Sequence, residues 1–321
     1  MIPDFWYFYG MNLPFSTPYN LLAIVGPTAS GKTALAVALA RMLSGEIISA
    51  DSRQVYRGMD IGTGKDLSEY GAGENRIRAH LIDIVDAGYH YNVFEYQRDF
   101  LEVLNNLSLG NRFPLLCGGS GLYIEAVLKN YRLIQVPPDP ELRRELSGKS
   151  IEELTAILKS YRSELHNHTD TENERRAIRA IEIARYYAQN NPDEVSLPDI
   201  RPLVAGIIVD REVRRDRITR RLHSRIEEGL IEEVRNLLDN GLLPNDLIYY
   251  GLEYKYITQY IAGNLGFDAM LAELTIAIHQ FAKRQMTWFR RMERNGIQIH
   301  WIDESLPFDD KISMVLKWLK G

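Results

Sequence analysis

Short apolar runs and helix-spaced apolar residues alternate along the first part of the chain. Four buried strands are predicted by apolar runs at residues 21–25, 46–49, 80–85 and 113–117. Apolar positions at helical spacing predict helices over residues 34–42 and 93–107. This alternation favours an α/β fold in which helices flank both faces of a parallel sheet. In such sheets, ligands bind at the carboxyl ends of the strands.

The pattern changes at the proline-rich segment 137–140. A polar region rich in Glu and Arg follows with helical periodicity, which predicts a mostly helical insertion subdomain over residues 131–200. A strand predicted over residues 203–209 resumes the core pattern. We therefore expect an N-terminal extension (1–20), the first part of the core (21–130), the insertion, and a mostly helical second part of the core (201–321).

The second part of the core is predicted to contain two long helices. One of them carries apolar residues along a single side, namely Ile218, Leu222, Ile226, Val234 and Leu238. The other is predicted over residues 268–292, before a last strand over residues 297–302 and a short final helix.

Composition narrows the class of protein. With 321 residues the chain is long enough for one large domain or two modest ones. Its single cysteine, Cys117, lies in an apolar run and is expected to be a buried strand residue. One cysteine excludes a disulfide or a cysteine-based zinc site within the chain, and it favours a reducing compartment. The net charge of −5 argues against nonspecific coating of nucleic acid but allows a local basic groove.

Residues 1–20 are aromatic and interrupted by prolines, without a basic start or a continuous apolar stretch. This pattern predicts neither a signal peptide nor a membrane span. No later segment has a continuous apolar stretch of membrane-spanning length. We expect a cytoplasmic monomer with no membrane association.

A phosphate-binding loop follows the first predicted strand. It fits G-x-x-x-x-G-K-[ST] at every fixed position and consists of Gly26, Pro27, Thr28, Ala29, Ser30, Gly31, Lys32 and Thr33. Its backbone amides, the start of the next helix and the Lys32 ammonium attract phosphate, and the Thr33 hydroxyl suits Mg²⁺. Kinases, nucleotide hydrolases and some group transferases share this loop, so the chain is predicted to have a P-loop core but the phosphate compound stays open.

Three other segments follow predicted strands and are candidates for the same crevice. Asp51–Tyr56 offers a carboxylate that can accept a proton or sit near Mg²⁺, although a strand-end cap explains it equally well. Residues 81–86 resemble the strand and Asp that hold Mg²⁺ in nucleotide hydrolases, but that pattern is common. The glycine-rich turn at residues 118–121 allows a ligand to approach the backbone closely.

Arginines concentrate at residues 175–185, 211–225 and 283–294. Acidic residues are interspersed, so each cluster alone is typical of a solvated, salt-bridged face. Three clusters in an acidic protein favour at least one that binds phosphates.

Taken in order, these motifs resemble those of the tRNA dimethylallyltransferases, the bacterial tRNA isopentenyltransferase family. The matching segments read GPTASGKT, DSRQVYRGMDIGTGK, HLIDI, LLCGGSGLYIEAVL, ERRAIRAIE and AKRQMTWFRR, between about Leu21 and Trp301. The phosphate loop alone is unspecific. In series with the Asp51 segment and AKRQMTW it is highly specific.

The resemblance implies that the loop binds the diphosphate of dimethylallyl diphosphate and does not split ATP. The dimethylallyl group would pass to the exocyclic amine of the adenine on the 3′ side of the anticodon. Asp51 would be the general base. The leaving group would be bound by Lys32, Arg217 and Thr33, the last together with a Mg²⁺ ion held largely through the diphosphate. Thr28 would also reach the ligand.

The resemblance also implies a tRNA-binding surface in which the insertion grips the anticodon stem. Its residues would be Asp51, Ser52, Arg53, Gln54, Ser120, Arg143, Arg175, Arg176 and Arg179. Ser120 stands where the family usually has Thr. The chain also departs from the family's pattern at residues 62–65, where Gly64 replaces Ala, at residues 172–176, and at residues 250–253, where Glu253 replaces Lys. The last two departures bear on tRNA contacts, so tRNA preference is the property that they affect.

Other functions fit the sequence less well. A P-loop small-molecule kinase would turn over ATP and would leave the Asp51 segment and the arginine-rich insertion without a purpose. An adenylate (AMP or ADP) isopentenyltransferase has related chemistry but lacks a long tRNA-gripping insertion. An RNA-binding protein with a vestigial loop is disfavoured because Lys32, Thr33, Asp51 and Arg217 are all present.

Overall fold

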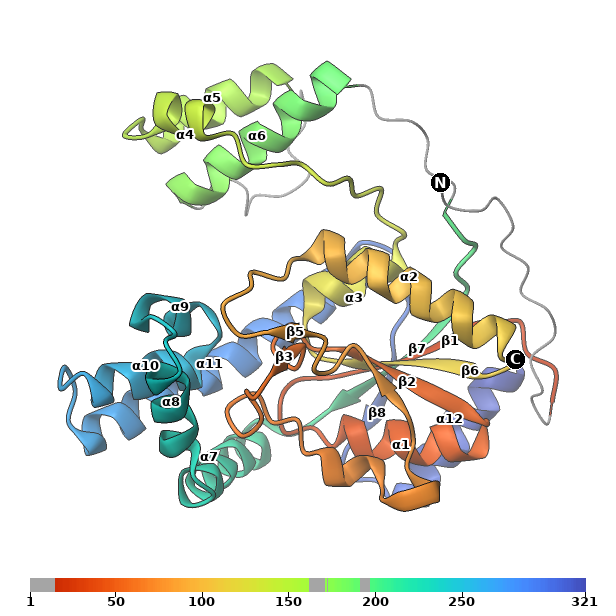
Figure 1. Ribbon diagram of the computed structural model, residues 1–321. Helices are drawn as coiled ribbons and strands as arrows, with labels where there is room; N and C mark the ends of the chain where they lie inside the picture. The colour runs from red at the N-terminus through yellow and green to blue at the C-terminus, as the bar shows by residue number, and fades with distance from the viewer. Residues whose placement is uncertain (1–14, 162–170, 172, 191–196) are drawn as a thin grey trace. The chain divides into compact units, whose positions relative to one another are not determined.

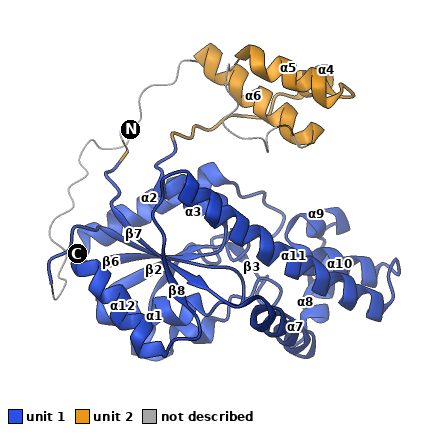
Figure 2. Ribbon diagram, turned by 180° about the vertical axis from the view of Figure 1, so that it is seen from behind, with its two compact units in different colours: residues 1–131, 198–321 blue, residues 132–197 orange. Residues whose placement is uncertain are grey.

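The computed structural model describes residues 15–161, 171, 173–190 and 197–321 (Figure 1). The chain forms two compact units, which are drawn in different colours in Figure 2. One unit comprises residues 1–131 and 198–321, and the other comprises residues 132–197. Most of the predicted N-terminal extension lies outside the described residues.

A six-stranded parallel sheet forms the centre of the larger unit, in the order β4-β2-β6-β1-β7-β8. The strands are β1 (Leu21–Val25), β2 (Gly45–Ala50), β4 (Ala79–His80), β6 (Phe113–Gly118), β7 (Pro202–Ile208) and β8 (His300–Asp303). β1 and β6 are buried along their whole length, as their apolar sequences require in a sheet covered on both faces. The predicted α/β fold with a parallel sheet is therefore confirmed.

Alternate side chains of β1 enter two different cores. Leu22 and Ile24 pack in the cluster that includes α1 (Lys32–Met42) and α12 (Phe308–Lys320). Leu21, Ala23 and Val25 point to the opposite face and pack in the cluster with α2 (Val93–Leu109), α3 (Gly121–Leu128) and α11 (Phe267–Arg294). Figure 1 shows α1 and α12 on one side of the sheet and α2 and α3 on the other. Both faces of the sheet are therefore covered by helices.

The strand predicted over residues 80–85 is wrong. β4 ends at His80, and Val85 begins β5 (Val85–Asp86), which pairs with β3 (Tyr56–Arg57) in a separate two-stranded sheet. Leu81 and Asp83 between them have positive φ angles of 60° and 55°, which no strand accommodates. The chain turns here and so leaves the main sheet for the second one.

The long helix predicted through Ile218 and Leu238 is two helices. α7 (Arg211–Glu227) ends before Gly229, whose φ of 101° breaks the helix, and α8 (Leu230–Asp239) starts again in a new direction. The helix predicted over residues 268–292 is confirmed by α11. The last strand, predicted from residue 297, begins at His300.

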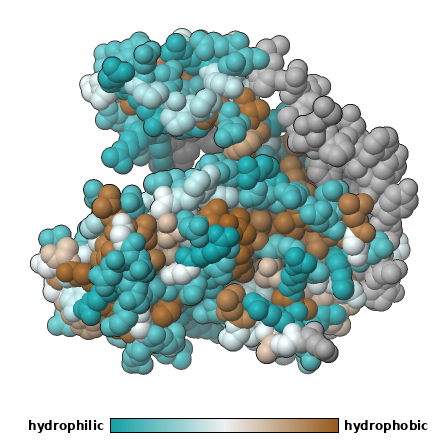
Figure 3. Space-filling model, viewed as in Figure 1, coloured by the Kyte–Doolittle hydropathy of each residue, from teal (hydrophilic) through white to brown (hydrophobic). Residues whose placement is uncertain are grey.

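Two short helices follow α8, namely α9 (Pro244–Tyr249) and α10 (Leu252–Ile261). Figure 3 shows apolar side chains gathered at the surface over α9 and again near β3, β5 and α3. Leu243, Ile248 and Tyr249 are 64%, 40% and 39% exposed, respectively. The segment around α9 therefore presents apolar side chains to solvent.

The smaller unit is helical in its described part, with α4 (Pro140–Leu146), α5 (Ile151–Tyr161) and α6 (Glu174–Asn190). It has a core of its own, made of Leu142, Leu146, Leu154, Leu158, Ala177, Ile178, Ile181 and Ala184. The predicted mostly helical insertion is thus present as a separately packed unit. None of the helices in the described ranges is long and apolar enough to cross a membrane.

Candidate functional site

The phosphate-binding loop connects β1 to α1. Gly26 leaves no room for a side chain, since an added Cβ would lie 2.8 Å from Ser30 Oγ and 3.3 Å from the Ile207 carbonyl oxygen. Gly31 has a φ of 77° and immediately precedes α1, as a loop that turns its amides toward an anion requires. The loop residues singled out in the sequence therefore come together at the carboxyl end of β1.

Gln285, in α11, fixes this loop to the neighbouring glycine-rich turn. Its Oε1 accepts a hydrogen bond of 2.9 Å from the Thr28 amide, and its Nε2 donates one of 3.0 Å to the Gly119 carbonyl oxygen. The side chain is 8% exposed. It is the glutamine of the AKRQMTW segment, which the sequence marked without assigning it a role.

Lys32 and Thr33 begin α1 at the inner side of the loop. Lys32 Nζ lies 3.4 Å from the Pro27 carbonyl oxygen. Burial lowers the pKa of Lys32, while the nearby Cys117 and Asp51 act in the opposite direction. The Thr33 side chain lies near Glu69 and near the buried thiol of Cys117, whose pKa is raised by burial to about 12. The ammonium and the hydroxyl expected to meet a diphosphate are therefore neighbours.

Asp51 follows β2 directly and is half-buried. Its Oδ1 accepts a 2.9 Å hydrogen bond from the Arg53 amide, and its charge acts on Lys32 and Cys117. The Ser52 amide donates to Ser120 Oγ at 2.9 Å, so the Asp51 segment is tied to the turn after β6. The carboxylate consequently lies beside the phosphate loop, neither sealed in apolar packing nor turned away.

Gln54 and Arg53 occupy different environments. Gln54 donates to the Gly64 carbonyl oxygen at 3.0 Å and accepts from Ser49 Oγ at 3.0 Å, so both ends of its amide are used within the protein. Arg53 instead lies over the ring of Tyr249, at 5.1 Å from its centroid. The Gln54 amide is therefore engaged within the protein, whereas the Arg53 guanidinium lies against a partly exposed ring.

Arg217, expected to bind the leaving group, forms a two-pronged ion pair with Glu304, with both N–O distances at 2.9 Å. Arg221, one turn further along α7, bonds Asp66 at 3.0 Å, and its charge lowers the pKa of Lys32. Arg221 therefore lies close enough to the phosphate loop to act on it. In the sequence, Arg221 belongs to an arginine cluster and closes the family's R-I-x-x-R pattern that begins at Arg217, but only Arg217 was assigned a role.

An acidic segment lies beside the loop. Glu69 belongs to a short 3₁₀ helix (Leu67–Tyr70), and its pKa is raised first by burial and then by Asp66. Lys65, 1% exposed at its side chain, anchors this segment through ion pairs with Asp60 and Asp83. Asp83 is thus committed to Lys65, which argues against the magnesium-binding role suggested by its strand pattern.

No group of three or more His, Cys, Asp or Glu side chains in the described residues could hold a metal ion. A Mg²⁺ ion at this site would need oxygen ligands from a bound diphosphate. The Thr33 hydroxyl is a suitable protein ligand for it, because Mg²⁺ is commonly held by few protein groups and by substrate phosphates.

In the smaller unit, two of the predicted tRNA-binding arginines share a buried carboxylate. Glu182, 1% exposed at its side chain, binds Arg143 at 2.6 and 2.9 Å and Arg179 at 2.9 Å. Burial opposes the charge of Glu182, but these hydrogen bonds lower its pKa below the ordinary value. Arg175 and Arg176 are exposed on α6.

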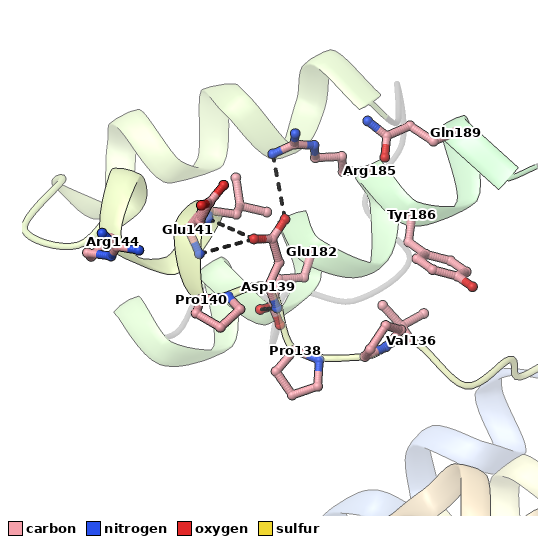
Figure 4. A pocket seen from close by; sticks show the side chains of 12 residues that line it. Val136, Pro138, Asp139, Pro140, Glu141, Arg144, Glu182, Arg185, Tyr186 and Gln189 are labelled. Carbon is pink, nitrogen blue, oxygen red and sulfur yellow. Dashed lines mark hydrogen bonds and ion pairs between the residues drawn. The ribbon is translucent and has the colours of Figure 1, made fainter.

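The same unit contains an open cavity of about 580 Å³ (Figure 4). Asp139, Glu182, Arg185 and Tyr186 are among its lining residues, and Figure 4 shows the Arg185 guanidinium directed toward the Asp139 carboxylate. None of the phosphate-loop residues, Asp51 or Ser120 lines it. The cavity is therefore lined by residues of the smaller unit and by none of these groups.

Comparisons with known proteins agree with these features. The profile of the family described as IPP transferase matches residues 54–292. The chain is 59% identical over 302 residues to tRNA dimethylallyltransferase 2 of Bacteroides fragilis, covering 94% of this chain and 98% of the relative. It is 57% identical over 303 residues to tRNA dimethylallyltransferase 1 of Parabacteroides distasonis, with the same coverage of both chains.

Solved structures give the same assignment. The full-length tRNA isopentenylpyrophosphate transferase of Bacillus halodurans is 34% identical and superposes with a TM-score of 0.68, covering 94% of this chain and 96% of that one. A eukaryotic dimethylallyltransferase acting on tRNA shares the fold, with a TM-score of 0.73 at 20% identity over 93% of this chain and 77% of that one. The chain therefore belongs to the IPP transferase family.

Proposed function

We propose that the protein transfers a dimethylallyl group from dimethylallyl diphosphate to the exocyclic amine of the adenine 3′ of the anticodon in tRNA, with release of diphosphate. The observation that carries this proposal is the convergence of the phosphate loop, Asp51 and the Ser120 turn at one edge of the sheet. The names of the curated relatives, which are tRNA dimethylallyltransferases, support the same reaction.

The first part of the reaction is loss of the diphosphate. An allylic carbon leaves diphosphate with carbocation character, so groups that neutralise the departing charge lower the barrier. Lys32 and the loop amides would bind this charge, and Mg²⁺ would add positive charge on the diphosphate beside Thr33. The diphosphate would compete with Glu304 for the Arg217 guanidinium, so that Arg217 also binds the departing charge. Arg221, on the next turn of α7, would add positive charge nearby.

The second part is attack by the adenine amine. This amine is a poor nucleophile while the base is stacked, so the base must leave the stack to reach the crevice. Asp51 would accept its proton as the new C–N bond forms. The Arg53 amide holds the carboxylate in place, and the Ser120 turn bounds the same crevice, where its hydroxyl can contact the nucleotide.

We propose that the helical insertion at residues 131–200 binds the anticodon stem of the tRNA. Arg175 and Arg176 are exposed for phosphate contacts, and Glu182 holds Arg143 and Arg179 in fixed orientations. We also assign the enzyme to the cytoplasm and expect it to act as a monomer.

The test is to incubate the protein with Mg²⁺, dimethylallyl diphosphate and tRNAs that carry adenine at the target position, and to analyse the nucleosides by mass spectrometry. Prenylated adenosine from tRNA is the expected product. Product on free AMP or ADP alone would favour an adenylate isopentenyltransferase. Phosphoryl transfer from ATP without prenylation would favour a kinase.

A further inference from the structure

Tyr249 presents an aromatic ring to solvent at the end of α9. The residue is 39% exposed and lies between two side chains from other segments. The Arg53 guanidinium is 5.1 Å from the centroid of its ring, and the His90 ring centroid is 4.4 Å away at an interplanar angle of 55°. A planar cation, a phenol and an imidazole thus form one cluster, which we call the Tyr249 cluster.

The cluster rests on a rigid support. Tyr250 is fully buried, and its hydroxyl accepts a 2.6 Å hydrogen bond from the Gly88 amide and donates to the Tyr89 carbonyl oxygen at 3.2 Å. Its ring meets that of Tyr249 edge-on, with the centroids 5.4 Å apart. The segment that carries His90 is therefore fastened to α9, and little conformational freedom remains to be lost when a ligand stacks on Tyr249.

The Tyr249 cluster borders the crevice that contains Asp51. The Arg53 amide binds the Asp51 carboxylate, and the charges of Arg53 and Asp51 both act on the buried Tyr123. Tyr249 acts on Tyr123 as well. Tyr123 is 7% exposed and stacks on Tyr96 at a centroid distance of 4.2 Å, so Tyr249, at 39% exposed, and not Tyr123, presents a ring to solvent here.

We propose that the Tyr249 cluster is a stacking platform for the nucleotide next to the target adenine in the RNA loop. Single-stranded RNA is bound through bases that stack on aromatic rings and on arginine planes, with cations that contact the backbone. Removing one base from a stacked loop also exposes the face of its neighbour, which Tyr249 can cover. This inference rests on the proposed function, because it takes the base that enters the Asp51 crevice to be an adenine of tRNA.

The first experiment measures stacking in the wild-type enzyme. An anticodon stem-loop is prepared with 2-aminopurine in place of the nucleotide on each side of the target adenine in turn. In the bound complexes, the fluorescence at one of the two positions is expected to be lower with the wild type and with Tyr249→Phe than with Tyr249→Ala, because only the first two place an aromatic ring on the base. Equal fluorescence in the wild-type and Tyr249→Ala complexes at both positions would overturn the platform.

The second experiment separates stacking from charge. Tyr249→Ala is expected to raise the KM for tRNA by about 10-fold or more, leave the KM for dimethylallyl diphosphate unchanged, and keep the wild-type salt dependence of tRNA binding. Arg53→Ala is expected to reduce the salt slope by about one unit. Phe267→Ala removes a ring of similar exposure, 40%, at the start of α11 and is the matched control expected to bind tRNA as the wild type does.

The outcomes distinguish this inference from the proposed function. A wild-type enzyme that does not prenylate tRNA removes the proposed function and the platform together. An active wild type with unchanged tRNA KM in Tyr249→Ala removes the platform alone. A KM that rises equally in Tyr249→Phe and Tyr249→Ala also contradicts stacking, because phenylalanine keeps the aromatic face.

Discussion

Gln285→Ala is predicted to uncouple the phosphate loop from the glycine-rich turn. The substitution removes the hydrogen bonds to the Thr28 amide and the Gly119 carbonyl oxygen, at 2.9 and 3.0 Å. Each neutral hydrogen bond contributes about 1 kcal/mol net, so two amount to about 2 kcal/mol, more if the freed groups stay buried without partners. A loss of that size corresponds to a melting temperature lower by about 4–8 °C.

Activity is expected to suffer more than stability. Gln285 holds two ligand-facing segments in register, and a misplacement of about 1 Å in a catalytic site costs roughly 100-fold in rate. We expect kcat/KM to fall between about 10- and 100-fold, measured by transfer of labelled prenyl groups to tRNA.

Gln97→Ala is the matched control for this prediction. Gln97 is also buried, and its Nε2 donates to two carbonyl oxygens, those of Ala126 and Tyr131, at 3.0 and 2.7 Å, but it contacts neither loop nor turn. The Gln97→Ala variant should lose about as much stability as Gln285→Ala does, but its kcat/KM should stay near that of the wild type. A Gln285→Ala enzyme that is less stable yet fully active would refute the assigned role of Gln285.

Three further predictions concern the site and its surroundings. Asp51→Asn should abolish turnover while tRNA affinity, measured by filter binding, stays within several-fold; loss of binding as well would contradict the general-base role. Burial lowers the pKa of Lys32, so Lys32 should lose its proton at a lower pH than an ordinary lysine does. The affinity of the enzyme for inorganic diphosphate should therefore fall as the pH rises through that lowered pKa. Calorimetry should find no such alkaline loss in Lys32→Arg, whose guanidinium stays charged. Gly64→Ala should cost about 1–3 kcal/mol by thermal denaturation, because an added Cβ would lie 1.7 Å from Arg225 Nη2 and φ is 65°. Arg225→Leu in the same chain should recover part of that loss, and no recovery would point to the backbone conformation alone.

Local patterns in the sequence were sufficient for the parts of the fold whose determinants are contiguous. The phosphate loop and α11 follow from spacing within one segment, and the buried strands follow from continuous apolar runs. Gly229 was the local signal that could have divided the helix predicted through Leu238. At the break between β4 and β5, Asp83 forms an ion pair with Lys65 from another segment, and the local pattern of residues 80–85 does not signal this contact.

Contacts between distant segments explain what the sequence could not assign in the site. Gln285 meets Thr28 across 257 positions of the chain, and Arg217 meets Glu304 across 87. Separations of this length produce no periodic pattern in the sequence that could predict the contacts. The same holds for Tyr249, whose contacts with Arg53 and His90 join distant segments of the chain.

Cys117 bears on how such an enzyme protects itself from its own substrate. An ionising allylic diphosphate is an alkylating agent, and a thiolate is a far stronger nucleophile than an adenine amine. The thiol is buried beside Thr33, and its raised pKa of about 12 keeps it protonated at neutral pH. The burial that lowers the pKa of Lys32 thus also keeps the only thiol in the sequence from acting as a thiolate toward the prenyl group.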